Sequence, residues 1–226
     1  MSTTERSLPA FQPVRAASLA DSVVTQLRRA IVDGEIPEGY RLRETDLAAQ
    51  FHVSRATIRQ ALSRLRYEGL IEIRPHRGAI VGRMSLEAAY DVCVVRGVLE
   101  GWAARTACTA LAAHQLAEMR ALCTEMGDRL RAGDVLGLVE ADIGFHRFIC
   151  ESDANEQLRE HWYSLNALHG ALMSTHLAYY TYDPEGVAAM HENLCDVLAE
   201  RDPDLAELSI RLHYVRARGA DDGEQA

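Results

Sequence analysis

The chain has 226 residues, of which 48% are hydrophobic and 25% are charged, and this mixture is typical of a soluble globular protein with two modest domains. Its formal net charge of −9 is unevenly divided, because residues 1–84 hold 13 arginines against 9 acidic residues and the remainder holds 11 against 24. All basic residues are arginine, which excludes lysine-dependent enzymes. No stretch approaches the about 20 apolar residues that span a bilayer, so we do not expect a membrane protein. The first 17 residues lack the apolar core of a signal peptide, so we do not expect a secreted protein.

The first third of the chain has the outline of a winged helix-turn-helix domain, which we expect over residues 18–83. It follows an arm at residues 1–17 that we expect to be disordered. Ser18 and Ser54 are suitable N-caps, and Gly34 follows the first helix. The predicted elements are, in order, helices at 18–34, 44–51 and 54–69 and short β-strands at 70–73 and 79–81. A turn sequence at 74–78 separates the two strands.

The third helix has the features of a DNA recognition helix. Its buried stripe consists of Ile58, Ala61, Leu62 and Leu65. Arg55 and Arg59 lie beside that stripe near the helix N-terminus, where such a helix presents side chains to the major groove. Arginine can bond guanine or phosphate through its fork, and Ser54 marks a helix N-terminus that suits a phosphate. The alternative is a solvated helix with two surface arginines.

From Ser85 onward the sequence predicts an all-α bundle, followed by a polar tail at residues 219–226. The expected helices cover residues 86–110, 113–132, 134–151, 155–180, 185–201 and 203–218. The chain is therefore mainly α. Five cysteines without a C-x-x-C motif, at 93, 108, 123, 150 and 195, indicate small core residues kept reduced in the cytoplasm.

Three of the C-terminal helices place a carboxylate or imidazole on an inward stripe. Asp142 and His146 are four residues apart on one face, and His191 and His213 lie on inward faces of later helices. Such a set of nitrogen and oxygen ligands suits zinc, nickel or manganese. The alternative for each histidine is an ordinary hydrogen-bonded core residue. His169 and His176 share a helix face and either line a pocket or pack in the core.

Arg96 lies on a stripe with Val92, Val95, Leu99 and Ala103. It is either a clamp for a carboxylate ligand or the partner of Glu100 in a structural ion pair.

The N-terminal segment resembles the GntR family of bacterial transcription regulators. The residues that carry the resemblance are IVDGEIPEG at 31–39, LRETDLA at 42–48, VSRATIRQAL at 53–62, LxxEGLI at 65–71 and RGAxV at 77–81. The chain departs from the common pattern at Ala56-Thr57 and at Gln60, which affects the operator sequence that it would read. The resemblance, together with the helix N-terminus, implies DNA-contacting residues at Arg43, Thr45, Ser54, Arg55, Thr57, Arg59, Arg77 and Gly78.

The C-terminal segment resembles the FCD ligand-binding domain of the FadR-type branch of that family. Its marks are Arg96-x-x-x-Glu100, Asp142-x-x-x-His146, Asn155, His191 and His213. The resemblance implies an effector-binding and dimerisation domain over residues 84–218. It also implies a divalent metal ion, zinc before nickel or manganese, held by Asp142, His146, His191 and His213. Arg96 is then the candidate effector-binding residue.

These observations together predict a metabolite-responsive bacterial transcription regulator and not an enzyme. It would bind double-stranded operator DNA with a short inverted repeat as a homodimer, act as a repressor in the family's usual mode, and respond to a small organic acid. Two alternatives remain open: a regulator that senses the metal itself, and a metal-dependent hydrolase with a DNA-binding appendage.

Overall fold

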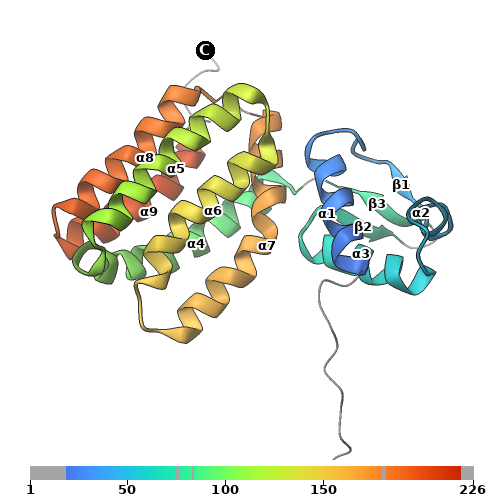
Figure 1. Ribbon diagram of the computed structural model, residues 1–226, viewed down its shortest axis with the longest axis horizontal. Helices are drawn as coiled ribbons and strands as arrows, with labels where there is room; N and C mark the ends of the chain where they lie inside the picture. The colour runs from blue at the N-terminus through green and yellow to red at the C-terminus, as the bar shows by residue number, and fades with distance from the viewer. Residues whose placement is uncertain (1–18, 75–76, 83, 180–181, 220–226) are drawn as a thin grey trace, which may run out of the picture.

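The computed structural model describes residues 19–74, 77–82, 84–179 and 182–219. The predicted arm, the predicted cap at Ser18 and the tail from residue 220 lie outside these described residues. Figure 1 shows two bodies side by side, a small domain of helices and a sheet and a larger bundle of helices. None of the described helices is long and apolar enough to cross a bilayer.

The smaller body is the predicted winged helix-turn-helix. Its elements are α1 (Leu19–Val32), β1 (Arg41–Leu42), α2 (Glu44–Phe51), α3 (Arg55–Tyr67), β2 (Ile71–Arg74) and β3 (Gly78–Val81). The apolar stripe predicted for α3 is buried against α1, α2 and the sheet, with Ile58 and Leu65 completely covered. This packing fixes the opposite face of α3 toward solvent.

The sheet has three antiparallel strands in the order β1-β3-β2, whereas the sequence predicted only the β2–β3 hairpin. The additional strand pairs Arg41 with Ile80 and Leu42 with Ala79. Two residues are too few to show a period, so β1 is defined only by its partner. The third helix also ends at Tyr67, slightly before the predicted Gly69, which has a φ of +72°.

The larger body contains the six predicted helices with only small shifts of their ends. They are α4 (Leu86–Ala110), α5 (Ala113–Ala132), α6 (Val135–Glu151), α7 (Glu156–Tyr179), α8 (Pro184–Ala199) and α9 (Pro203–Gly219). Ser85, Asp134 and Asp183 cap α4, α6 and α8 by accepting a backbone N–H through the side chain. The five cysteines are free and buried, as expected.

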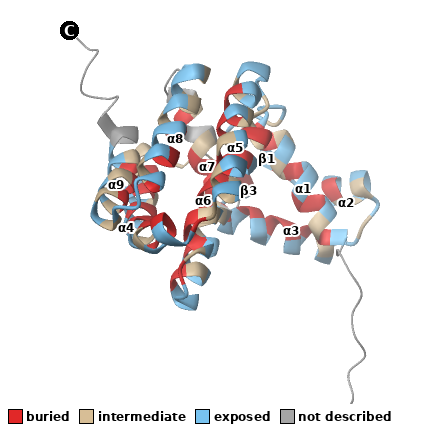
Figure 2. Cartoon of the chain, turned by 60° about the vertical axis from the view of Figure 1, so that its left-hand side comes forward, coloured by how far each residue is buried: buried red, intermediate tan, exposed pale blue. Residues whose placement is uncertain are grey.

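Buried residues follow the inner faces of the helices, and exposed residues cover their outer faces (Figure 2). One predicted position is wrong, because Val95 was placed on one stripe with Arg96, and Val95 is 48% exposed whereas Arg96 is fully buried. The buried face of α4 is centred on Arg96, Glu100, Ala103 and Ala107, and Val95 lies about 100° around the helix from Arg96, outside this face.

The two bodies meet along α7. Ala171 of α7 is 3% exposed and belongs to the apolar core of the winged helix domain. A Cβ atom placed on Gly69, after α3, would lie 3.5 Å from the Ala171 Cβ and 3.4 Å from the terminal methyl carbon of Met84. The winged helix domain therefore packs directly on a helix of the bundle.

Candidate functional site

The N-terminus of α3 presents two arginines at the surface. Ser54 caps the helix, since its Oγ accepts the Thr57 N–H at 3.1 Å. Arg55 and Arg59 both approach the Glu44 Oε2 atom, at 3.5 and 2.9 Å, and their side chains are 59% and 64% exposed. Ion pairs at this exposure contribute little to stability, so both arginines can exchange Glu44 for another anion.

These arginines line a hollow of about 580 Å³ between α2, α3 and the sheet. The polar and glycine residues of its lining are Arg41, Arg43, Glu44, Thr45, Arg55, Arg59, Ser63, Arg66 and Gly78. Five of these are arginines and one is acidic, so the hollow favours a polyanion. Arg41 and Arg66 were missed by the sequence analysis, although Arg66 is seven residues after Arg59 and thus on the same helix face.

Three further predicted DNA-contacting residues are Arg77 and Thr57, which do not line the hollow, and Gly78, which does. Arg77 is exposed in the turn before β3, where its N–H donates to the Arg74 carbonyl at 3.1 Å. Gly78 has a φ of +76°, and a Cβ there would meet no described atom within 4 Å. The wing backbone is therefore open to close approach. Thr57 shares a hydrogen bond with Ser54 at 2.9 Å.

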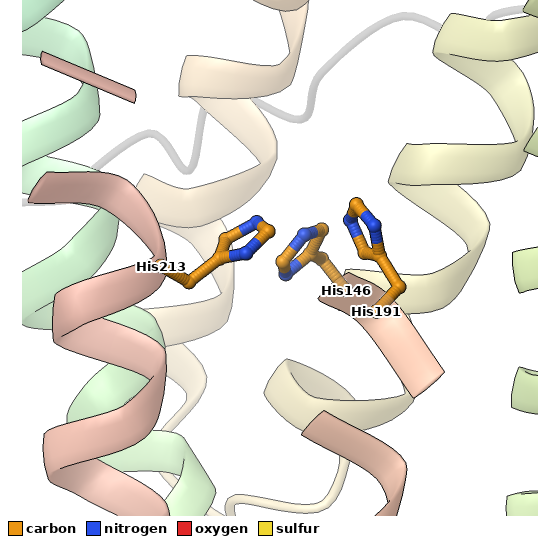
Figure 3. Close-up of side chains that lie close together, drawn as sticks. All are labelled: His146, His191 and His213. Carbon is orange, nitrogen blue, oxygen red and sulfur yellow. The ribbon is translucent and has the colours of Figure 1, made fainter. Parts of the chain in front are cut away.

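In the bundle, three histidines from three helices point toward one another (Figure 3). His146 lies on α6, His191 on α8 and His213 on α9. One ring nitrogen of each lies within 4.8 Å of the other two, a grouping that could hold a metal ion. The structure thus brings the three predicted imidazoles together, and their role as ligands remains a prediction.

Asp142, the fourth predicted ligand, lies at the edge of this histidine cluster. Its Oδ1 atom is 3.2 Å from His191 Nε2 and 3.8 Å from His146 Nε2. Its Oδ2 atom is 2.8 Å from Nε2 of His169, on α7. Burial opposes its charge, but His146 and His169 outweigh that effect and hold the pKa of Asp142 well below its ordinary value.

The donor atoms fit a divalent ion. His146 Nε2 and His213 Nδ1 are buried without a hydrogen-bond partner among the described residues. Such buried polar atoms are costly unless something satisfies them. Three imidazole nitrogens and one carboxylate oxygen form a ligand set that zinc, nickel or manganese accepts.

Outer contacts orient two of the imidazoles. His191 Nδ1 is 2.9 Å from the Val187 carbonyl oxygen, which can only accept, so the proton is on Nδ1 and Nε2 is left as a ligand. His146 Nδ1 is 2.6 Å from the Glu100 Oε2 atom, and this contact likewise leaves Nε2 for a metal.

Glu100 is the centre of a completely buried network. Its Oε1 atom accepts hydrogen bonds from Trp162 Nε1 at 2.7 Å, Tyr214 Oη at 2.8 Å and Arg96 Nε at 3.0 Å. Burial alone would raise the pKa of Glu100, but His146 and Arg96 outweigh burial and lower it to about 2. Glu100 therefore remains an anion, and sequence reasoning considered it only as a partner of Arg96.

The structure shows the ion pair of Arg96 with Glu100 that was one of the two interpretations of this arginine. The guanidinium also hydrogen-bonds through Nη1 to Nδ1 of His169, and the side chain is fully buried. His169 in turn contacts Asp142 through Nε2. A role of Arg96 toward an effector remains a prediction.

The histidine cluster opens into a cavity of about 140 Å³. Its polar end is formed by Asp142, His146, His169, His191, His213 and Tyr214. Its apolar wall is formed by Leu130, Leu138, Leu172, Met173, Leu177, Val187 and Met190, and Cys93, His176 and Tyr182 complete the lining. His169 and His176 therefore line a pocket, one of the two alternatives considered for them.

Two family models match successive parts of the chain. The model of the gntR family of bacterial regulatory proteins matches residues 19–81, and the model of the FCD domain matches residues 91–216. The chain is 32% identical to the probable D-xylose utilization operon transcriptional repressor of Paenarthrobacter nicotinovorans, over 87% of each chain. It is 27% identical to the HTH-type transcriptional repressor RspR of Escherichia coli (strain K12), covering 93% of this chain and 90% of the relative.

Solved structures show the same fold. A putative transcriptional regulator GntR from Rhodococcus sp. RHA1 aligns with a TM-score of 0.70 at 22% identity, covering 92% of this chain and 99% of the other. Escherichia coli McbR/YncC aligns with a TM-score of 0.68 at 22% identity, covering 91% and 97%.

Proposed function

Because this chain belongs to the gntR family of bacterial regulatory proteins and carries an FCD domain, it is a transcription regulator, and we propose that it is a repressor controlled by a small organic acid. The acid would bind at a divalent metal ion in the bundle, and the protein would bind an inverted-repeat operator as a homodimer. The observation that carries the proposal is one chain holding both an arginine-lined recognition face and a buried three-histidine cavity. Relatives named as repressors support repression over activation.

In this proposal α3 enters the major groove of the operator. Arg55 and Arg59 leave Glu44 and bond guanine edges or phosphates, because either offers an acceptor geometry that matches the guanidinium fork. The open backbone at Gly78 lets the wing approach the adjacent minor groove.

The bundle would hold the metal through His146, His191, His213 and Asp142. When bound, the ion would act as a Lewis acid that takes a carboxylate oxygen of the effector. Glu100 and the Val187 carbonyl would keep the two imidazoles oriented, and the apolar wall would exclude water from the bound acid.

A second copy of the chain would cover an apolar surface on α4 and α9. The two helices run antiparallel, since Gly97 packs on Tyr214 and Gly101 on Arg211. Helical spacing then directs six exposed side chains to one outer face, namely Val94, Val98, Trp102, Leu208, Leu212 and Val215, which are 40–57% exposed. Contiguous exposed apolar surfaces of this kind mark protein interfaces, and a two-fold dimer would pack the same four helix faces together.

The proposal is tested by selecting duplexes from a random pool with the purified protein and measuring its affinity for the selected site. We expect a two-fold symmetric site whose affinity changes when an organic acid is added to the zinc-loaded protein. A change produced by zinc alone, with no further effect of any acid, would instead establish the metal-sensing alternative. Failure to select any site would contradict the regulatory proposal itself.

A further inference from the structure

We propose that the effector is a small monocarboxylic acid with a short aliphatic body, of about six or seven non-hydrogen atoms. This inference rests on the proposed function, because it assumes that one carboxylate binds at the metal. Three features narrow the class of organic acid: the lining of the cavity, its volume and the position of Arg96.

Among its described lining residues, the cavity offers one charged end and no second cationic side chain beyond the histidines. None of the described residues that line it is an arginine, and its apolar lining consists of leucine, methionine and valine side chains. A second carboxylate on the ligand would be buried against this wall without a partner, which costs far more than an aliphatic group gains. The lining therefore selects against dicarboxylic and tricarboxylic acids.

Arg96 does not supply the missing cation. Its side chain is fully buried, and it pairs with Glu100 at 3.0 Å and hydrogen-bonds to His169. Its Nη2 atom has no hydrogen-bond partner among the described residues, but the side chain is not part of the described lining of the cavity. It acts through His169, whose Nε2 contacts Asp142, and is thus a positioning residue for the cluster. In this proposal Arg96 orients His169 and is not the carboxylate clamp that was one of its two interpretations.

The hydroxyl groups of a sugar acid also find few partners. Beyond the polar end of the cavity, the polar residues of its described lining are His176 and Tyr182, with Cys93 as a weak third. Tyr182 Oη and His176 Nδ1 lie 3.3 Å apart and share one hydrogen bond, so part of their hydrogen-bonding capacity is already used within the protein. A polyhydroxylated acid would therefore leave several hydroxyl groups buried without acceptors or donors.

The volume sets the length of the acid. A cavity of about 140 Å³ is close to the size of the engineered apolar cavity of about 150 Å³ that accepts benzene, with six carbon atoms. Butanoate, 2-methylpropanoate and 3-methylbutanoate have this size. Octanoate is too long to enter without moving the wall.

The experiment is calorimetric titration of the zinc-loaded full chain with five acids: acetate, 2-methylpropanoate, 3-methylbutanoate, succinate and glycerate. We expect the affinity to rise by about fourfold for each added methyl or methylene group from acetate to 3-methylbutanoate. Succinate and glycerate are expected to bind at least about tenfold more weakly than 3-methylbutanoate.

A pair of variants on one helix tests the cavity directly. Leu130→Ala removes part of the apolar wall and so enlarges the cavity. Leu116→Ala removes another half-buried leucine of α5, one that does not line the cavity. We expect Leu130→Ala to shift the optimum toward longer acids such as 4-methylpentanoate and hexanoate, and Leu116→Ala to keep the wild-type order.

Each outcome has a distinct meaning. If succinate or glycerate binds as tightly as 3-methylbutanoate, the inference is overturned while an acid-binding metal site stands. If no acid binds although zinc is present at one ion per chain, both the inference and the proposed effector class fail. If the two leucine variants behave alike, the assigned cavity is wrong.

Discussion

Arg59 is the side chain whose removal tests most directly whether α3 contacts the operator. It makes the closer of the two contacts with Glu44, and its side chain is 64% exposed. Arg59→Ala should leave the folded protein intact, because an exposed ion pair contributes little, and should weaken operator binding by at least about 1 kcal/mol, or about fivefold. Fluorescence anisotropy with the selected operator measures this loss.

Arg64→Ala is the matched control, because Arg64 lies on the same helix but pairs with Asp21 and does not line the arginine-rich hollow. It should bind the operator with nearly wild-type affinity. If the two variants lose equal affinity, α3 is not oriented on DNA as proposed.

The histidine cluster is tested by the double substitution His146→Ala and His213→Ala. Elemental analysis should find about one metal ion per wild-type chain and none in the variant. A chelator should lower the melting temperature of the wild type by about 5–10 °C at a free ion concentration near a hundred times Kd, and should leave the variant unchanged. His161→Ala, at an exposed position of α7, is the control. A variant that still copurifies with one ion would show that the ligand set is wrong.

Glu100 predicts a pH dependence of stability. Its pKa falls from 4.5 to about 2 on folding, so the unfolded chain binds more protons between these values. The stabilisation by this carboxylate, up to about 3 kcal/mol, is therefore present above pH 4.5 and is lost as the pH falls toward 2. Denaturant unfolding at pH 5 and pH 3 should show a smaller difference for Glu100→Gln than for the exposed control Glu118→Gln. Equal differences would mean that Glu100 does not carry the effect.

Residue spacing could predict part of this site and not the rest. Asp142 and His146 share a face because they are four residues apart, and His191 and His213 lie on inward stripes. The contacts of Glu100 join it to Trp162 and Tyr214, 62 and 114 residues away, and no local period indicates such contacts. The link from Arg96 through His169 to Asp142 was missed for the same reason.

At the scale of elements, helix ends could be predicted because the chain marks them chemically. Ser85, Asp134 and Asp183 cap three helices, and Gly133 ends α5 with a φ of +69°. β1 has no such mark, because it consists of two residues ordered by β3. The outward position of Val95 was missed since α4 is apolar on both its inner and outer faces.

The apolar outer face of α4 and α9 predicts the oligomeric state. We expect the wild type to be a dimer, and Val98→Glu combined with Leu212→Glu, which places charges on both helices of this face, should convert it to a monomer. Tyr67→Glu, at a 63% exposed position of α3, should leave the dimer intact. Sedimentation velocity measures both variants. A double variant that remains a dimer would place the interface elsewhere.

At the scale of the whole molecule, α7 connects the two sites. His169 contacts Asp142 at the cavity, and Ala171, two residues further along, lies in the core of the winged helix domain. A shift of α7 on ligand binding would therefore move the C-terminal end of α3, because Gly69 packs on Ala171. Because coupling between sites is reciprocal, operator DNA should change the affinity for the acid by the same factor by which the acid changes operator affinity.

The coupling between the histidine cavity and the DNA-binding face is measured most directly by the operator affinity of the zinc-loaded protein with and without a saturating amount of the tightest-binding acid. We predict a change of at least about fivefold in the wild type and none in the double variant His146→Ala and His213→Ala. Equal operator affinities in the wild type, with the acid demonstrably bound, would contradict the claim that the histidine cavity controls the DNA-binding face.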